Sequence, residues 1–193
     1  SDLQVQTITG STDSGGNTTR SISRTRVVYN GAGSKRGWYV DLQVNTAAAG
    51  ETPRYAAIGE RFIATPRIQS GRVFFTTFTP SEDSCNPGGD NFVYGLDLLS
   101  GSGALANVQV LPSNTPACTG ADCGAIRINQ GGAPVTSNSV AAINPLVPIT
   151  SPAPGACTPG VDCPTFEQCQ VVVYPGAFVL PRPCGRQSWR QLR

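Results

Sequence analysis

Three stretches decide the fold of this chain: GERFIATP at residues 59–66, RVFFTTFTP at residues 72–80 and FVYGLDLLSG at residues 92–101. They are short runs rich in β-branched and aromatic residues, and glycine, proline, serine and asparagine separate each run from the next. Such runs are typical of β-strands joined by tight turns. Because residues 73–78 are apolar on both faces of the expected strand, we expect this strand to lie centrally in its sheet.

The same pattern extends in both directions from this region. Trp38, Val40, Leu42 and Val44 alternate with residues of the opposite face, which predicts a half-buried strand with Trp38 in the core. Residues 3–7 alternate in the same way. Residues 171–180 predict a hairpin that turns at proline and glycine and places residue 169 opposite residue 182. No window has a sustained helical period, so we expect an all-β fold of short antiparallel strands.

Composition restricts the function. The chain has 193 residues, of which 13% are charged, with 22 Gly, 16 Pro, no Met and a net charge of +2. The small net charge argues against nucleic-acid binding, and no stretch is apolar over the length that a membrane span needs, so we expect no membrane insertion. We expect an exported fragment of a longer protein. Because the chain has no His, it cannot form a His-based catalytic triad.

Seven cysteines favour disulfides in an oxidising compartment over a zinc site. We expect two local disulfide loops, Cys118 with Cys123 and Cys157 with Cys163, and a bridge between Cys169 and Cys184 across the hairpin. Cys85 is then the odd cysteine. The pairing stays open, since seven cysteines allow about 105 ways of forming three bridges.

A change of composition suggests three segments. Residues 1–111 form a β region, residues 112–168 form an insertion rich in Cys, Pro and Gly, and residues 169–193 complete the same domain with a hairpin and a C-terminal strand. Asp122 and Asp162 occupy equivalent places in the two expected disulfide loops. They are candidates for adhesion contacts, although an Asp in a turn more often accepts backbone hydrogen bonds.

The acidic residues give weak functional signals. Asp83 and Asp90 lie in one loop and could bind calcium, but their spacing matches no known calcium loop, so we favour a structural role and expect no cofactor in this fragment. Glu60 with Asp41 or Asp97 could form a glycosidase pair. The simpler prediction is a strand-end ion pair between Glu60 and Arg61.

Four motifs resemble the C-terminal region of the PilY family of type IV pilus proteins. They are residues 6–9 with Arg20 following, RGWYVDL at residues 36–42, the long stretch at residues 59–101, and GRQSWRQL at residues 185–192. The resemblance implies partial or modified β-propeller blades that carry the disulfide-stapled insertion. It also implies a role in pilus assembly, opposition to retraction and adhesion. The family's calcium-binding loop and its Arg-Gly-Asp motif do not occur in this chain.

Two hypotheses follow. The favoured one is a non-enzymatic module at the pilus tip or cell surface, with minor pilins as partners and a host-cell, mineral or abiotic surface as the adhesion target. The alternative is a fragment of an exported quinoprotein-like or glycan-active propeller enzyme. Turnover of sugars or alcohols in the presence of pyrroloquinoline quinone and calcium would favour the alternative.

Overall fold

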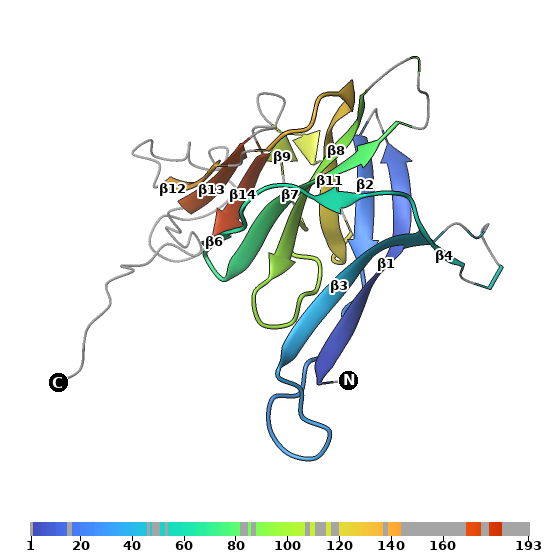
Figure 1. The fold of residues 1–193 in the computed structure, drawn as a ribbon. Coiled ribbons are helices and arrows are strands. Elements are labelled where there is room, and N and C mark those ends of the chain that lie inside the picture. The colour runs from blue at the N-terminus through green and yellow to red at the C-terminus, as the bar shows by residue number, and fades with distance from the viewer. Residues whose placement is uncertain are drawn as a thin grey trace, which may run out of the picture.

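The computed structural model describes residues 2–14, 17–45, 47, 51–52, 54–81, 85, 88–106, 109–110, 115–116, 120–136, 139–143, 169–174 and 178–182. Every regular element in these ranges is a β-strand, so the all-β prediction is confirmed for the described residues (Figure 1). None of these residues forms a helix of the length and hydrophobicity that crossing a membrane requires. The strands are β1 (Leu3–Ser14), β2 (Asn17–Ile22), β3 (Gly37–Asn45), β4 (Tyr55–Ala57), β5 (Arg61–Phe62), β6 (Arg67–Gln69), β7 (Arg72–Pro80), β8 (Gly89–Asp97), β9 (Gln109–Val110), β10 (Thr115–Pro116), β11 (Cys123–Gly132), β12 (Ser139–Ile143), β13 (Cys169–Tyr174) and β14 (Phe178–Arg182).

The larger sheet has nine strands in the order β4-β3-β1-β2-β11-β8-β7-β5, with β6 also paired to β7. It curls into a half-barrel, which is consistent with part of a propeller-like fold (Figure 1). The expectation of antiparallel pairing is wrong at one place, because β1 and β3 are parallel. After β2, the connection through residues 23–36 carries the chain past β1, so that β3 runs in the same direction as β1 on its other side.

A smaller sheet of five strands has the order β10-β9-β14-β13-β12, and β12 lies beside β6 of the larger sheet. Its hairpin β13–β14 has the register expected from the sequence, with Cys169 opposite Arg182 and Val173 opposite Phe178. The turn between these strands and Cys184 lie outside the described residues.

Strand β11 lies at the centre of the larger sheet, although it comes from the segment expected to be an insertion. It pairs with β2 through Cys123 and Ala125, and with β8 through Ala125, Ile126 and Arg127. The division into three segments stays a prediction, but residues 123–132 are part of the main scaffold.

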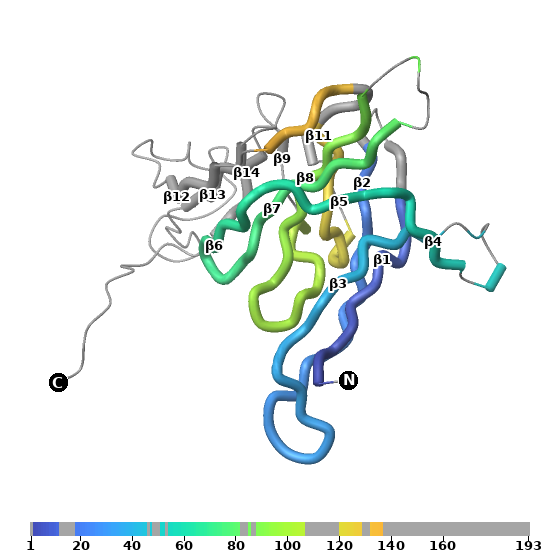
Figure 2. Tube along the Cα trace, viewed as in Figure 1, coloured from blue at the N-terminus to red at the C-terminus, as the bar shows by residue number. Residues whose placement is uncertain are grey.

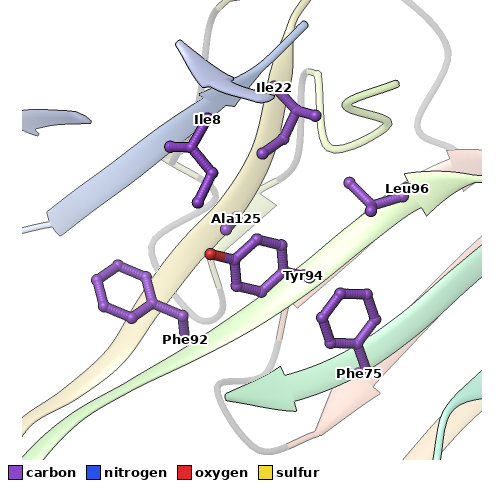
Figure 3. Packing of buried hydrophobic residues seen from close by; sticks show 7 residues of the cluster. All are labelled: Ile8, Ile22, Phe75, Phe92, Tyr94, Leu96 and Ala125. Atoms are coloured by element: carbon purple, nitrogen blue, oxygen red, sulfur yellow. The ribbon is translucent and has the colours of Figure 1, made fainter. Parts of the chain in front are cut away.

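The main hydrophobic cluster lies on one face of the curled sheet, and Phe74, Val93 and Ile126 are buried on the other face of the central strands. Figure 3 shows side chains from β1, β2, β7, β8 and β11 meeting in the main cluster, namely Ile8, Ile22, Phe75, Phe92, Tyr94, Leu96 and Ala125. Trp38, Val40, Leu42 and Val44 of β3 pack against this cluster, which confirms the face predicted for that strand. The middle of β7 is buried and has paired strands on both sides, as the apolar run predicts.

Strand β1 directs a polar residue inward. Gln6 and Ile8 are buried, whereas Leu3 and Val5 are exposed on the other face. Val5 lies opposite Tyr39, which is also exposed. Polarity alone therefore does not give the inward face of this strand.

Candidate functional site

A buried polar cluster joins side chains from several strands of the larger sheet. Arg20 of β2 pairs with Ala125 of β11, and Ala125 pairs in turn with Tyr94 of β8. Directly opposite residues of neighbouring strands lie on the same face. Because Ala125 ends in a methyl group, Arg20 can reach across β11, and its Nη1 donates to the Tyr94 hydroxyl at 2.7 Å.

Glu60, in the segment just before β5, completes the cluster. Its Oε2 accepts from Nη1 of Arg20, and its Oε1 accepts from the hydroxyls of Thr77 and Tyr94, the latter at 3.0 Å. The guanidinium carbon of Arg20 lies 3.7 Å from the centre of the Phe92 ring, in a cation–π contact. The expected pair with Arg61 is wrong: Glu60 forms its ion pair with Arg20, forty residues away in sequence.

The surroundings shift the pKa values of Tyr94 and Arg20. Burial raises the pKa of Tyr94 far above its usual value, and the negative charge of Glu60 adds to this effect. Burial alone would lower the pKa of Arg20, but Tyr94 and Glu60 outweigh it and the pKa is raised. Tyr94 is thus a neutral hydrogen-bonding group and Arg20 a permanent cation.

The cluster does not resemble an accessible active site. The side chains of Arg20 and Glu60 are 4% and 0% exposed, and the carboxylate of Glu60 is occupied by its three neighbours. Glu60 is therefore not available to act with Asp41 or Asp97 as a glycosidase pair. We interpret the cluster as a structural hydrogen-bond network that links β2, β7, β8 and the segment before β5.

The turn after β8 is the second polar arrangement of note. Oδ1 of Asp97 accepts from the backbone N–H groups of Leu99 and Ser100 at 3.0 and 2.7 Å. The N–H of Gly101 donates to the carbonyl of Asp97, and the N–H of Leu98 donates to the carbonyl of Gly71, both at 2.9 Å. Asp97 thus organises the turn and is not a free carboxylate.

The carbonyl groups of the turn are bound by three side chains from other parts of the chain. Trp38 Nε1 donates to Leu98 at 3.0 Å, the hydroxyl of Tyr29 donates to Leu99, and Gln6 Nε2 donates to Ser100 at 2.7 Å. The backbone polar groups from Leu98 to Ser100 therefore all have partners within the chain.

Gln6 connects this turn to the segment after β2. Besides its bond to Ser100, its Nε2 donates to the carbonyl of Thr25 at 2.7 Å. Its Oε1 accepts from the Ser23 hydroxyl and from the Thr25 N–H. These bonds explain why a fully buried glutamine occupies a core position of β1.

The weak calcium candidates are only partly described. The carboxylate of Asp90 lies 3.5 Å from Arg127, and Asp83 lies outside the described residues. The neighbouring Asn91 is buried and bonds to the backbone of Ala133 and Val135. No group of three or more potential metal ligands occurs among the described residues.

The cysteine predictions are also described only in part. Cys123 is buried at the start of β11 and is disulfide-bonded, but its partner is not described, so the pairing with Cys118 stays a prediction. Cys85 is exposed. Asp122 is half-buried, and its backbone carbonyl accepts from the N–H of Ile22, whereas the role of its side chain stays a prediction. The remaining predicted site residues fall outside the described side chains: Cys118, Cys157, Asp162, Cys163, Cys169 and Cys184.

The chain is similar in sequence to known proteins over most of its length. The chain is 37% identical over 192 residues to a type IV pilus biogenesis factor PilY1 homolog from Xylella fastidiosa, in an alignment covering 91% of the chain. The chain is a PilY-type sequence. It is also 28% identical over 164 residues, or 84% of the chain, to the type IV pilus biogenesis factor PilY1 of Pseudomonas aeruginosa, in the strains PAO1 and PAK.

The PilY-type relatives are much longer than this chain, which spans about 12% of their length. No protein-family model matches the chain, and no solved structure matches it. The PilY1-type relatives confirm the resemblance inferred from the four motifs over most of the chain.

Proposed function

We propose that this chain is a non-catalytic scaffold module of a type IV pilus biogenesis factor and that it supports pilus assembly and adhesion. The similarity to two biogenesis factors carries the proposal. The internal use of the polar groups supports it, since Glu60 and Asp97 both hold the scaffold together. The module acts outside the cytoplasm, at the cell surface or pilus tip, with minor pilins as partners.

The role in assembly is tested in a bacterium whose own copy of the gene is replaced. We compare the intact protein with Glu60→Ala, which leaves Arg20 buried without its anion, and with the exposed control Ile68→Ala. We expect Glu60→Ala to reduce surface pili and twitching motility strongly, whereas Ile68→Ala keeps both. Normal piliation by cells in which this module is absent or unfolded would contradict the proposal.

The role in adhesion requires a deletion that leaves the sheet intact. Removal of residues 112–168 would remove β11 from between β2 and β8 and unfold the scaffold. We therefore propose to delete residues 145–167, with Asp122→Ala and Asp162→Ala as single variants. Reduced attachment at unchanged pilus number supports a contact role for the insertion, whereas unchanged attachment by all three variants rejects it.

Calcium is not part of the proposed function of this module. The ion pair of Asp90 with Arg127 supports a structural role for that carboxylate. We expect the melting temperature of the purified chain to be the same in calcium and in a chelator. A calcium-dependent rise that is lost in Asp83→Asn and Asp90→Asn would show a site in this loop.

A further inference from the structure

Four large side chains are exposed where the connection after β2 meets the turn after β8. They are Val28, Tyr29, Leu98 and Leu99, which we call the turn patch, and Leu99 is the most exposed at 68%. The two segments are in direct contact, because the hydroxyl of Tyr29 donates to the carbonyl of Leu99. Large apolar side chains that gather on a surface often mark a contact site for another protein.

The turn patch has a rigid backbone. The N–H and carbonyl groups from Leu98 to Ser100 are bound by Asp97, Gly71, Trp38, Tyr29 and Gln6. A partner would therefore contact the side chains of Leu98 and Leu99, because the backbone N–H and carbonyl groups of this turn already have hydrogen-bond partners within the chain. Little conformational freedom of this backbone is lost on binding, which favours affinity.

The segment that carries Tyr29 is strongly basic. No Asp or Glu occurs between Asp13 and Asp41, whereas the interval holds five basic residues, of which Arg20 is buried and paired with Glu60. Arg24, Arg26 and Arg36 are exposed, and among the described residues none of them has an ion pair with a carboxylate. The carboxylate of Asp97, the acidic group nearest to Leu99 in sequence, is held inside its own turn.

We propose that the turn patch, with the three arginines, is a docking surface for a protein segment that presents an apolar side chain among carboxylates. Tyr and Arg are among the residue types that contribute most at protein interfaces. Leu99 and Tyr29 supply the desolvated centre, and the arginines supply charge complementarity and faster association. The proposal rests on the proposed function in one respect: the acidic partner belongs to the pilus assembly that this module supports.

The shape of the region favours a protein over a lipid surface. Figure 2 shows the connection between β2 and β3 projecting beyond the sheet. Its tip consists of Asn30, Gly31, Ala32, Gly33 and Ser34, which are small, polar or both. This tip carries no large apolar side chain, whereas insertion into a membrane needs large apolar residues at the leading point. A nucleic acid would use the arginines but leave Leu98 and Leu99 without a partner.

The test uses the full-length protein in the bacterium that makes it, with a photo-crosslinking amino acid in place of Leu99. The control carries the same amino acid in place of Ile68, an apolar residue of β6 that is 63% exposed. We expect crosslinking from position 99 to a protein segment rich in Asp and Glu, identified by mass spectrometry. In Arg24→Glu, Arg26→Glu and Arg36→Glu combined, we expect the yield to fall roughly tenfold. The three Lys substitutions should retain it.

Three results would overturn the proposal. They are a yield no higher than at position 68, a product that contains lipid, glycan or nucleic acid but no protein, and a protein product insensitive to charge reversal. Equal cellular amounts of the charge variants show that they fold. Failure of the proposed function is seen separately, as normal pili in cells that lack the module.

Discussion

The buried cluster around Glu60 and the turn patch around Leu99 reverse the usual distribution of side chains. The cluster encloses an arginine and a glutamate at almost no exposure, whereas the turn exposes two leucines to solvent. In both places, hydrogen bonding accounts for the arrangement. Glu60 is satisfied by Arg20, Thr77 and Tyr94, and the backbone of the turn is satisfied by Asp97 and by side chains of three other segments.

The difference shows which interactions the fold depends on. A buried charge requires its partner, because an uncompensated charge in the interior is very unfavourable. An exposed leucine costs little and is dispensable for stability. We therefore expect substitutions in the cluster to unfold the chain and substitutions of the exposed side chains to affect only its contacts.

Glu60→Ala is expected to have the largest effect. Removing the anion leaves Arg20 charged and buried, and breaking such a pair costs about 3–5 kcal/mol. Urea unfolding of the purified chain measures the loss. The double variant Arg20→Met with Glu60→Leu should lose less, because it leaves no unpaired charge; an equal or larger loss would show that the charges themselves are not the cause.

Gly101→Ala is expected to come next. The glycine has a φ of 71°, and a Cβ there would lie 2.3 Å from the Trp38 ring. Left-handed strain and overpacking together predict a loss of about 2–4 kcal/mol. Gly31→Ala is the matched control, since its φ is 88° with open space around it, and it should lose only about 1–2 kcal/mol. Equal losses at both positions would mean that the Trp38 contact is unimportant.

Gln6→Leu separates packing from hydrogen bonding. Leucine fills a similar space but leaves the partly buried carbonyl groups of Thr25 and Ser100 without the donor that Gln6 supplies. We expect a loss of about 2 kcal/mol. Ile8→Val on the same strand should lose about 1 kcal/mol, and a smaller effect for Gln6→Leu than for Ile8→Val would show that the glutamine bonds are dispensable.

The raised pKa of Tyr94 predicts a loss of stability at high pH. Below about pH 10 this tyrosine is neutral in both the folded and unfolded chains, so its contribution is complete. Above that pH the unfolded chain loses the proton while the folded chain keeps it, so the free energy of unfolding falls by up to about 1.4 kcal/mol per pH unit. Tyr94→Phe should show a shallower decline between pH 10 and 11, and an identical slope would contradict the assignment.

Leu99→Ala is expected to have the smallest effect, with a change in unfolding free energy within about 0.5 kcal/mol. Leu96→Ala, three residues earlier and fully buried, should lose about 2–5 kcal/mol. The same pair of unfolding curves therefore compares one residue type in two environments. A large loss for Leu99→Ala would mean that the turn patch is part of the core.

The sequence alone determined the local features of this protein. Short apolar runs between turn residues gave the strands, the alternation from Trp38 gave the inward face of β3, and the pattern around Pro175-Gly176 gave the register of β13 and β14. Four motifs gave the PilY-type relationship. These features depend on neighbours in sequence or on residue identities, so they can be read without the fold.

Only the tertiary structure decided the pairing of Arg20 with Glu60, the inward side of β1 and the parallel arrangement of β1 and β3. Each depends on which strands become neighbours. Arg20 contacts Tyr94 because β11 lies between their strands and places the small side chain of Ala125 between the two residues. Gln6 can be buried because Thr25 and Ser100 converge on it from distant segments. A local sequence pattern cannot predict such contacts, because they form and stabilise the chain only when distant strands have assembled.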